Sequence, residues 1–581
     1  MRRLFRYLIR TVVFLLILFL IIVISDYLSH RVQSDSVLVV TIDGPVVDRG
    51  GTGLLGLLNT QQTGLNFIRN AIDRGAKDPR ITGLALKVID PDMELAQAQE
   101  IAELVRSFAA TGKWTAAYLE TAGDDESGNL PFIVAASAGD VSMMPQGSFN
   151  MVGVRVREFF ARGTLDWLGI TPNFAAAGQY KSAFNIFTDK DFTPAQRQDD
   201  DALVGSMFDQ IVNGVARERN LKPDAVRALI DQAPLTAEMG LKSKLVDRLE
   251  YEDQFNDRVE NHGGSKHPVQ DYTSYARQSL FGGMAGHDHV AVVYGVGGIQ
   301  RGAGGFDPLV APTATGMTSD AMVDAFKSAR EDDAVRAVVF RIDSPGGSVL
   351  ASELIRRAVE LCAKKKPLVI SMGGYAASGG YWVATPADRI IAEPGTITGS
   401  IGVLGGKFNL TPAMQKIYLN SGAVSRGANV EMFDTFSDFT PQQLKIFQDQ
   451  ELGKTYDYFL KLVSDARHLP VDQVNQIAQG RVWTGEQALK VKLVDELGGF
   501  DQALAEAKKL AKLPSDEEVQ IVELPEQPGL LRSLASGKMD GVAKIDAPMA
   551  RMFAPVMHIL QRALHTHGSF IEAFCPVVPV L

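Results

Sequence analysis

Apolar runs typical of buried strands alternate along the chain with amphipathic segments of helical period, and the same order of segments occurs twice. The first series comprises residues 37–42, 64–74, 81–89, 94–109 and 114–119, and the second comprises residues 290–293, 318–330, 335–343, 348–363 and 368–372. Strands that alternate with helices of this length predict right-handed β-α-β crossovers. We therefore expect two α/β domains with mainly parallel sheets.

The two series belong to an internal repeat with a lag of about 250 residues. Residues 235–247 match residues 483–495, and a Phe-Thr-Pro marker opens a long helical segment in each copy. We predict an N-terminal repeat over residues 36–261, followed by a linker rich in Gly, His and Ser over residues 262–289. A C-terminal repeat then covers residues 290–513, and residues 514–581 form an extension of unassigned role.

Residues 1–35 form a separate apolar segment. Arg2, Arg3, Arg6 and Arg10 precede an almost unbroken apolar run over residues 12–24. With its flanks the run approaches the ~17–20 residues that a bilayer requires, and the arginines favour a cytoplasmic N-terminus. A cleaved signal peptide is the alternative, but no A-x-A-like pair of small residues follows the run. We expect one uncleaved N-terminal transmembrane helix in the bacterial cytoplasmic membrane, with the remaining chain on the periplasmic side.

Composition excludes some classes of function. The net charge is -10 and no long basic block is present, so the sequence gives no sign of a nucleic-acid partner. The two cysteines, Cys362 and Cys575, form neither a disulfide framework nor a metal quartet. We expect neither a metal ion nor an organic cofactor.

A serine stands at a predicted corner between a strand and a helix. Residues 373–382 read Gly-Gly-Tyr-Ala-Ala-Ser-Gly-Gly-Tyr-Trp and follow the apolar run 368–372. Ser378 would stand at the start of a helix that ends near Pro386. At the start of a helix its hydroxyl is exposed to substrate and lies close to N–H groups that can stabilise an anion. A turn of small residues that only packs a helix against a sheet is the alternative.

The repeat allows each copy to serve as a control for the other. The second copy has Gly346 and Gly347 where the first has Asp92 and Met93, and a glycine pair can aim backbone N–H groups into a cavity. Opposite Ser378 the first copy has Leu130, or Asn129 if the match slips by one residue. Conversely, Lys181 of the first copy matches Ala428 of the second. This complementary loss suggests one composite site between the two halves.

Lys181 is the candidate base. The nine histidines lie mainly in linkers and tail, which disfavours a Ser-His-Asp triad without excluding one. Burial can lower the pKa of a lysine until the neutral amine accepts a proton, and no other charged residue lies between Phe174 and Phe184. A surface lysine in a loop is the alternative. Ser400, in a Thr-Gly-Ser-Ile-Gly stretch, offers a hydroxyl that could orient the amine.

Four blocks together resemble signal peptide peptidase A, also called protease IV, in its long duplicated form. The blocks are residues 180–183, 344–347, 375–382 and 396–402. The resemblance implies a ClpP/crotonase-like fold in both repeats, with Ser378 as nucleophile, Lys181 as general base and Ser400 as the group that positions the lysine. It also implies an oxyanion hole formed by the N–H groups of Gly347 and Gly379. A membrane-attached homotetramer that degrades cleaved signal peptides is the implied assembly and function.

Two other functions stay open at this stage. A crotonase-like fold also hosts enzymes that act on acyl thioesters, although those usually use carboxylates as acids and bases. A non-catalytic membrane scaffold is the second alternative, because the first repeat itself lacks the serine.

Overall fold

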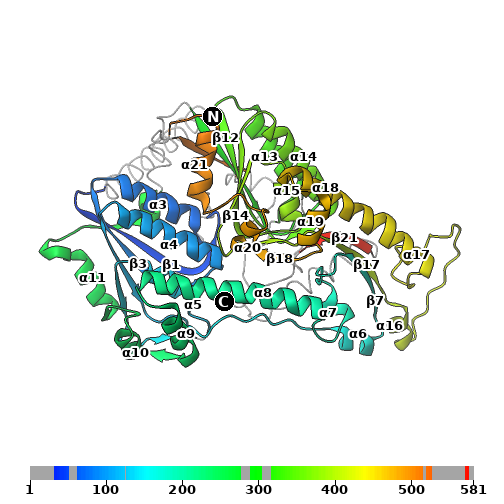
Figure 1. The fold of residues 1–581 in the computed structure, drawn as a ribbon, viewed down its shortest axis with the longest axis horizontal. Helices are drawn as coiled ribbons and strands as arrows, with labels where there is room; N and C mark the ends of the chain where they lie inside the picture. Colours follow the sequence, from blue (N-terminus) through cyan, green and yellow to red (C-terminus); the bar gives the residue numbers. More distant parts are fainter. Residues whose placement is uncertain are drawn as a thin grey trace, which may run out of the picture.

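The computed structural model describes residues 32–50, 62–124, 126–276, 288–303, 316–514, 519–526 and 569–574 (Figure 1). The predicted membrane anchor therefore lies almost wholly outside the described residues. Within the described part of the chain, no helix combines the length and apolar character needed to cross a bilayer.

Each half contains a parallel sheet flanked by helices. The N-terminal sheet has the order β10 (Val269–Asp271), β1 (Ser36–Val47), β3 (Ile81–Asp92), β4 (Trp114–Leu119), β5 (Asp140–Met143), β9 (Arg248–Leu249), and β2 (Thr63–Gly64) pairs with β1. The C-terminal sheet places β20 (Gln520–Leu524), β11 (His289–Val296), β12 (Val335–Ser344), β14 (Leu368–Ala377), β15 (Arg389–Ala392) and β19 (Glu496–Leu497) in the corresponding order. The predicted duplication is therefore present in the topology.

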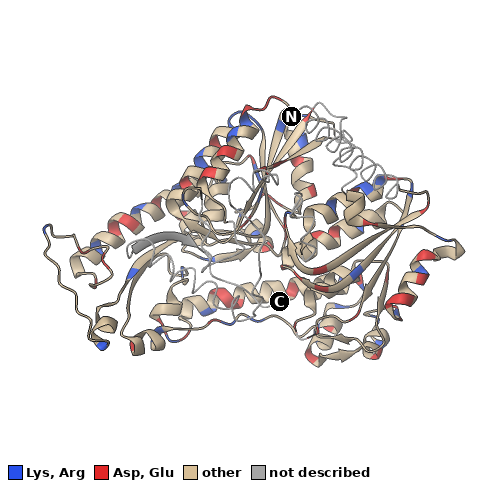
Figure 2. Cartoon of the chain, turned by 180° about the vertical axis from the view of Figure 1, so that it is seen from behind, with Lys and Arg blue, Asp and Glu red and all other residues tan. Residues whose placement is uncertain are grey.

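Helices cover both faces of each sheet in the same manner. One face of the N-terminal sheet packs against α3 (Leu65–Lys77), α4 (Leu95–Ala110) and α5 (Asn129–Ala136), and the other against α11 (Glu252–Glu260). In the C-terminal half the equivalents are α13 (Ser319–Glu331), α14 (Val349–Ala363) and α15 (Gly379–Ala384) on one face and α21 (Phe500–Leu510) on the other. Figure 2 shows charged residues of both signs along these outer helices, whereas the central strands carry few.

The remaining helices connect the halves or extend them. Their bounds are α6 (Arg162–Leu168), α7 (Asn185–Thr188), α8 (Pro194–Glu218), α9 (Pro223–Gln232), α10 (Ala237–Lys242), η1 (His262–Gly264), α16 (Thr411–Lys416), α17 (Pro441–Ile446), the π-helical η2 (Phe447–Gly453), α18 (Lys454–Arg467), α19 (Val471–Ile477) and α20 (Gly485–Lys490). The long helix α8 runs beneath both halves in Figure 1. Its Ser206 hydroxyl lies 2.9 Å from that of Thr484, which ties the N-terminal half to the C-terminal sheet.

Antiparallel pairing occurs in a separate sheet and in two short pairs of strands. A four-stranded sheet has the order β13 (Gly346–Ser348), β21 (Ser569–Phe574), β17 (Val403–Asn409), β7 (Thr171–Ala177), so it contains strands from both halves. Short pairs also correspond between the repeats: β6 (Ser148–Phe149) with β8 (Leu235–Thr236), and β16 (Ile397–Gly399) with β18 (Val482–Thr484). In the C-terminal half, β16 also pairs with the end of β14.

Segments expected to lie outside the two domains contribute strands to the sheets. Residues 262–289, predicted as a linker, contribute β10, which pairs with β1. The extension 514–581 contributes β20 to the edge of the C-terminal sheet and β21 to the antiparallel sheet. Both edge strands pair with the first strand of their repeat, so the sheets are wider than the apolar pattern alone predicts.

Buried ion pairs connect the halves. The guanidinium of Arg341 on β12 donates to Asp48 at 2.9 Å and to Glu100 at 2.8 Å, and Arg69 also binds Glu100 at 2.8 Å. Arg341 is fully buried. Burial opposes ionisation of Asp48, but the charge and hydrogen bond of Arg341 outweigh it and hold the pKa of Asp48 below its ordinary value. A buried cation of one half therefore depends on carboxylates of the other.

Candidate active site

Ser378 occupies the corner between β14 and α15. Its backbone has φ 56° and ψ −111°, a conformation that is uncommon for a residue with a side chain. The corner is held by two backbone hydrogen bonds, from Ser378 N–H to Gly399 O and from Trp382 N–H to Ser378 O, each 2.8 Å. α15 ends at Ala384, two residues before the expected Pro386.

Lys181 reaches this serine from the other half of the chain. Its Nζ lies 2.7 Å from Ser378 Oγ, 2.9 Å from Ser400 Oγ and 2.9 Å from the Ser400 carbonyl oxygen. The exposed fractions are 0% for Ser378, 3% for Lys181 and 2% for Ser400. The structure thus brings together the three side chains that the sequence singled out, although 197 residues separate Lys181 from Ser378.

A sheet shared between the halves positions the lysine. β7 pairs antiparallel with β17 of the C-terminal half, from Ala177 opposite Val403 to Thr171 opposite Asn409. The chain then turns at Gly178, and Tyr180 N–H donates to the Gln479 carbonyl at 2.8 Å. This pairing fixes the backbone from which Lys181 extends.

Two contacts of the lysine were not expected from the sequence. The first is the Ser400 carbonyl, an acceptor that has no side-chain signature and so could not be read from residue type. The second is Gly480, which packs directly against the Lys181 backbone. A Cβ at Gly480 would lie 2.5 Å from Lys181 N, and Gly480 has a φ of 78°, so only glycine fits here without strain.

The glycines expected to form the oxyanion hole lie beside the same corner. β13, which carries Gly347, contacts α15, whose first residue is Gly379. The first N–H of a helix has no acceptor within that helix. A Cβ at Gly347 would lie 2.4 Å from Ile299 O, and the φ of 150° also favours glycine. The first repeat has no such glycine pair, since Asp92 and Met93 stand there.

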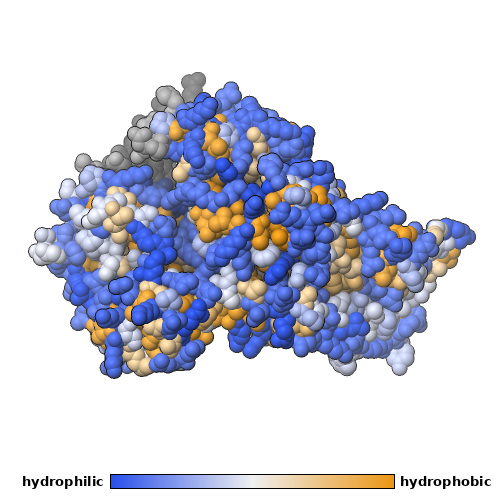
Figure 3. All heavy atoms as spheres, in the orientation of Figure 1, coloured by the Kyte–Doolittle hydropathy of each residue, from blue (hydrophilic) through white to orange (hydrophobic). Residues whose placement is uncertain are grey.

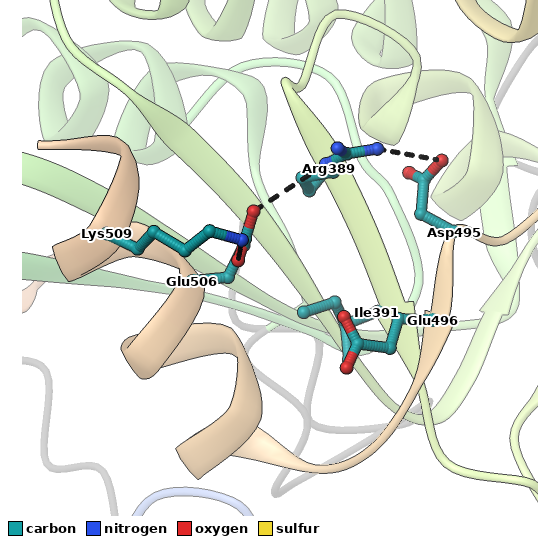
Figure 4. A pocket seen from close by; sticks show the side chains of 6 residues that line it. All are labelled: Arg389, Ile391, Asp495, Glu496, Glu506 and Lys509. Carbon is teal, nitrogen blue, oxygen red and sulfur yellow. Dashed lines mark hydrogen bonds and ion pairs between the residues drawn. The ribbon is translucent and has the colours of Figure 1, made fainter.

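A small polar pocket lies away from this corner (Figure 4). It has a volume of about 190 Å³ and lies between β15, β19 and α21. Its charged side chains pair with one another: Arg389 lies 3.9 Å from Asp495 and 3.7 Å from Glu506, and Lys509 lies 2.8 Å from Glu506. No serine lines this pocket, so it lacks the pairing of a serine with a lysine that is found at Ser378 and is not the candidate site.

The described residues contain no cluster of three or more potential metal ligands. The site consists instead of a hydroxyl, an amine and backbone N–H groups, and these can carry out nucleophilic attack, proton transfer and oxyanion stabilisation.

Comparison with known proteins agrees with this chemistry. The family model described as peptidase family S49 matches residues 121–266 and 360–514, once in each repeat. The chain belongs to peptidase family S49. The family indicates a serine peptidase, rather than the acyl-thioester enzyme or the non-catalytic scaffold that the sequence left open.

Several S49 relatives match over most of their length. Protease 4 of Salmonella typhi is 33% identical over 82% of this chain and 78% of its own, and Protease 4 of Haemophilus influenzae is 29% identical over 89% and 86%. The chloroplastic serine protease SPPA of Arabidopsis thaliana is 29% identical over 90% and 76%. A solved ClpP1 mutant of Listeria monocytogenes covers 37% of this chain and 94% of its own at 13% identity, with a TM-score of 0.24, too weak a similarity to assign the fold.

Proposed function

We propose that this S49 peptidase is an endopeptidase with a Ser-Lys dyad, in which Ser378 is the nucleophile and Lys181 the general base. The observation that carries the proposal is the 2.7 Å separation of Lys181 Nζ and Ser378 Oγ in a fully buried setting. Proton transfer needs heavy atoms within about 2.6–3.2 Å. The same amine donates to both the hydroxyl and the carbonyl oxygen of Ser400, each at 2.9 Å.

The reaction follows from the positions of these groups. The neutral amine of Lys181 takes the proton of Ser378 as its Oγ attacks the scissile carbonyl carbon, and the N–H groups of Gly347 and Gly379 stabilise the resulting oxyanion. The lysine returns the proton to the leaving amine when the C–N bond breaks. Water then hydrolyses the ester to the acid and frees Ser378. The two Ser400 oxygens orient the amine toward Ser378 throughout.

Covalent labelling tests the dyad. A serine-reactive peptidyl phosphonate should increase the mass of the wild-type chain by that of one bound label. Peptide mapping should locate the label on Ser378. Ser378→Ala and Lys181→Ala should take up no label. Lys366→Met is the matched control, because Lys366 is a second buried lysine whose Nζ donates to the backbone carbonyls of Ala329 and Asp332. Label on another serine in the folded Ser378→Ala variant would contradict the assignment.

The substrates we infer are cleaved signal peptides and similar apolar peptides. The sequence resemblance supports this, as does a further relative named putative signal peptide peptidase SppA from Enterococcus faecium, which is 33% identical over 32% of this chain. Wild type should cleave a synthetic signal peptide with a higher kcat/KM than a length-matched peptide whose apolar core is replaced by Ser and Gln. Equal rates on the two peptides would contradict this substrate class while leaving the dyad intact.

We also infer that residues 1–35 anchor the enzyme in the bacterial cytoplasmic membrane, with the catalytic body in the periplasm. The arginine-flanked apolar run supports this orientation. Protease added to spheroplasts should digest the body, whereas sealed inverted vesicles should protect it. Digestion from the cytoplasmic face would contradict the orientation.

Assembly into a homo-oligomer, expected to be a tetramer, is supported by surfaces that the repeats leave unmatched. The second-repeat segment that corresponds to β7 forms no strand and exposes Tyr418 and Val424, each 94% exposed. This arm, with α16 and α17, carries apolar and hydrophilic atoms side by side in Figure 3. The first-repeat segment corresponding to β17, residues 155–161, forms no strand beyond a single β-bridge residue, Arg155.

A second copy of the chain could join these two segments as β7 and β17 are joined within one copy. Light scattering should then report a closed oligomer, and Val424→Asp should dissociate it. A monomeric wild type in detergent at micromolar concentration would contradict the assembly.

A further inference from the structure

An arginine of the second repeat contacts the loop that carries the proposed base. The guanidinium carbon of Arg481 lies 5.4 Å from the ring centroid of Tyr180 and 4.5 Å from that of Trp483. Tyr180 directly precedes Lys181 in the chain. A guanidinium and an aromatic ring attract one another at these distances. The side chain of Arg481 therefore holds the loop of the first repeat against the second repeat, one residue away from the amine.

The backbone around Arg481 contacts both the lysine and its orienting serine. The carbonyl of Arg481 accepts the N–H of Ser400 at 2.7 Å. The residue before it, Gly480, packs against the backbone of Lys181. The strand after it, β18, pairs with β16 as far as Gly399, the neighbour of Ser400. A displacement of Arg481 would therefore move the amine and the two oxygens that receive its hydrogen bonds.

An aspartate of the first repeat anchors this segment. The carboxylate of Asp199 on α8 accepts the N–H of Val482 at 3.0 Å and lies 3.3 Å from Nε of Arg481. The side chain of Asp199 is 6% exposed and that of Arg481 is 23% exposed. Solvent screens such a pair less than an ion pair on the surface, so removal of one partner leaves a poorly compensated charge. One carboxylate thus fixes both the backbone and the side chain of the segment.

Neither repeat contains this ion pair by itself. When the two repeats are matched as above, Arg481 corresponds to Ala233 and Asp199 corresponds to Ile446. Each copy therefore has an apolar residue where the other has a charged one. Lys181 and Ser378 show the same complementary pattern. The pair Asp199 and Arg481 is accordingly divided between the halves in the same way as the dyad.

A second ion pair shows the opposite pattern. Arg467 and Asp495 lie 2.6 Å apart in the second repeat, and their counterparts Arg219 and Asp247 lie 2.7 Å apart in the first. An ion pair that occurs in both copies stabilises the fold that the copies share. It cannot account for a property that belongs only to the composite site. The repeated pair therefore provides an internal control for the divided one.

We propose that Asp199 and Arg481 are positioning residues for the dyad. The pair holds Lys181 and Ser400 in the arrangement in which the amine faces the hydroxyl of Ser378. This inference rests on the proposed dyad. Its effect is on the orientation of the base, not on substrate binding, and a displacement of reacting groups by about 1 Å can cost about 10² in rate.

Steady-state kinetics of full-length variants test the proposal. Arg481→Met should lower kcat for a fluorogenic peptide by about tenfold to a hundredfold and leave KM within about twofold, because substrate still binds while the amine faces Ser378 less often. Labelling of Ser378 by a small fluorophosphonate, which has no peptide portion, should slow by a similar factor. Unchanged kcat in an Arg481→Met variant that is folded by circular dichroism would overturn the proposal.

Arg467→Met is the matched control. It removes the repeated ion pair from the same half of the chain, and the side chain of Arg467 is only 10% exposed. It should lower the midpoint of thermal unfolding while kcat and the rate of fluorophosphonate labelling stay at the wild-type values. A loss of kcat as large as that in Arg481→Met would show that any weakening of the fold has this effect, and would overturn the proposal.

Variants of Asp199 show whether the two residues act together. In a double-mutant cycle, Asp199→Ala combined with Arg481→Met should lower kcat no further than either change alone, because each already releases the segment. Losses that multiply would overturn the pairing. Asp199→Asn keeps an oxygen for the N–H of Val482 and removes only the charge, so it tests the proposal even where a larger change prevents folding. Its kcat should fall at least threefold with KM unchanged, and a wild-type kcat would overturn the proposal.

Failure of this proposal differs from failure of the dyad. Absence of label on Ser378 in the wild type would contradict the dyad itself. Labelling of Ser378 at equal rates in wild type and in folded Arg481→Met would leave the dyad in place and remove the positioning role of the ion pair.

Discussion

The two halves of this peptidase share one strand order but differ where the third strand ends. In the C-terminal half β14 continues to Ala377, and α15 starts at Gly379, so a single residue, Ser378, makes the corner. In the N-terminal half β4 ends at Leu119 and α5 begins only at Asn129. The sheet is therefore a common scaffold, and the reactive position depends on how abruptly the chain leaves it.

A second difference concerns the strands that project from each half. Only the N-terminal half forms β7, and only the C-terminal half forms β17, so the two halves complete one shared sheet. The lysine belongs to the half without the serine. The two domains thus make unlike contributions to the site, because one presents the proposed nucleophile and the other the proposed base.

Removing either member of the dyad should give the largest effect. Ser378→Ala and Lys181→Ala should each lower kcat by several orders of magnitude, and Lys181→Arg should be equally poor because a guanidinium stays protonated. Steady-state hydrolysis of a fluorogenic peptide measures this, with circular dichroism to verify folding. Substantial activity in Lys181→Arg would show that the base lies elsewhere.

Arg341 tests the dependence of one half on the other. Arg341→Met leaves Asp48 and Glu100 buried without their shared cation and should lower the free energy of unfolding by about 3–5 kcal/mol. Its counterpart in the first repeat is Lys87, whose partner Glu252 is about half exposed, so Lys87→Met should cost about 1 kcal/mol or less. Denaturant titration compares the two variants, and equal losses would contradict a special role for the buried pair.

The second repeat differs from the first in the glycine pair Gly346 and Gly347, which lies beside the proposed oxyanion hole. Gly347→Ala should lower kcat by about 10²–10³, because its N–H can no longer hold its position when a Cβ meets Ile299 O. Gly302→Ala is the matched control: it also has a positive φ, but a Cβ there meets no atom within 4 Å. The control should retain its kcat. Similar kcat values for the two variants would exclude Gly347 from the oxyanion hole.

Substitution of Asp343 should produce the smallest of these effects, a change in how stability depends on pH. Burial, followed by the charge of Asp48, raises its pKa to about 7. At pH values between the ordinary pKa of an aspartate and about 7, Asp343 holds a proton in the folded state that the unfolded chain has released. Stability that is present at low pH is therefore lost as the pH rises through this window. Asp343→Asn should flatten this dependence by about 1–2 kcal/mol, since relaxation of the surroundings reduces the full effect of burial. The matching position of the first repeat is Ile89, which cannot titrate.

Thermal unfolding of Asp343→Asn between pH 4 and 8 checks this sign. An unchanged slope would contradict the raised pKa. The asparagine oxygen can still accept the 2.9 Å hydrogen bond from Tyr375 N–H, so the substitution removes the charge with little loss of contacts.

The sequence predicted the strands and helices that occur in both copies and the site positions at which the two copies differ. The strand and helix segments of both copies appear near their expected bounds, because apolar period and turn residues are local signals. The closeness of Lys181 and Ser378 was foreseen from the complementary losses at Ala428 and Leu130. Their assignment as base and nucleophile stays a prediction, as do the roles of Ser400, Gly347 and Gly379.

Other features had no local signal. β10 and β20 are short edge strands, and their pairing with β1 and β11 depends on contacts distant in sequence. The carbonyl of Ser400 and the close packing of Gly480 depend on backbone geometry rather than residue type. β21 lies in a stretch flanked by glycine and prolines, so its pairing could not be anticipated. Long-range pairing of this kind is set by the assembled fold.

The sheet formed by β7 and β17 has a consequence for how activity depends on the amount of enzyme. Because both strands belong to one polypeptide, the amine and the hydroxyl meet at a local concentration that dilution cannot change. The dyad of each chain is then complete whatever number of copies assemble, and turnover per chain should stay constant down to concentrations at which any oligomer has dissociated. A dyad divided between separate chains would instead lose activity as subunits part.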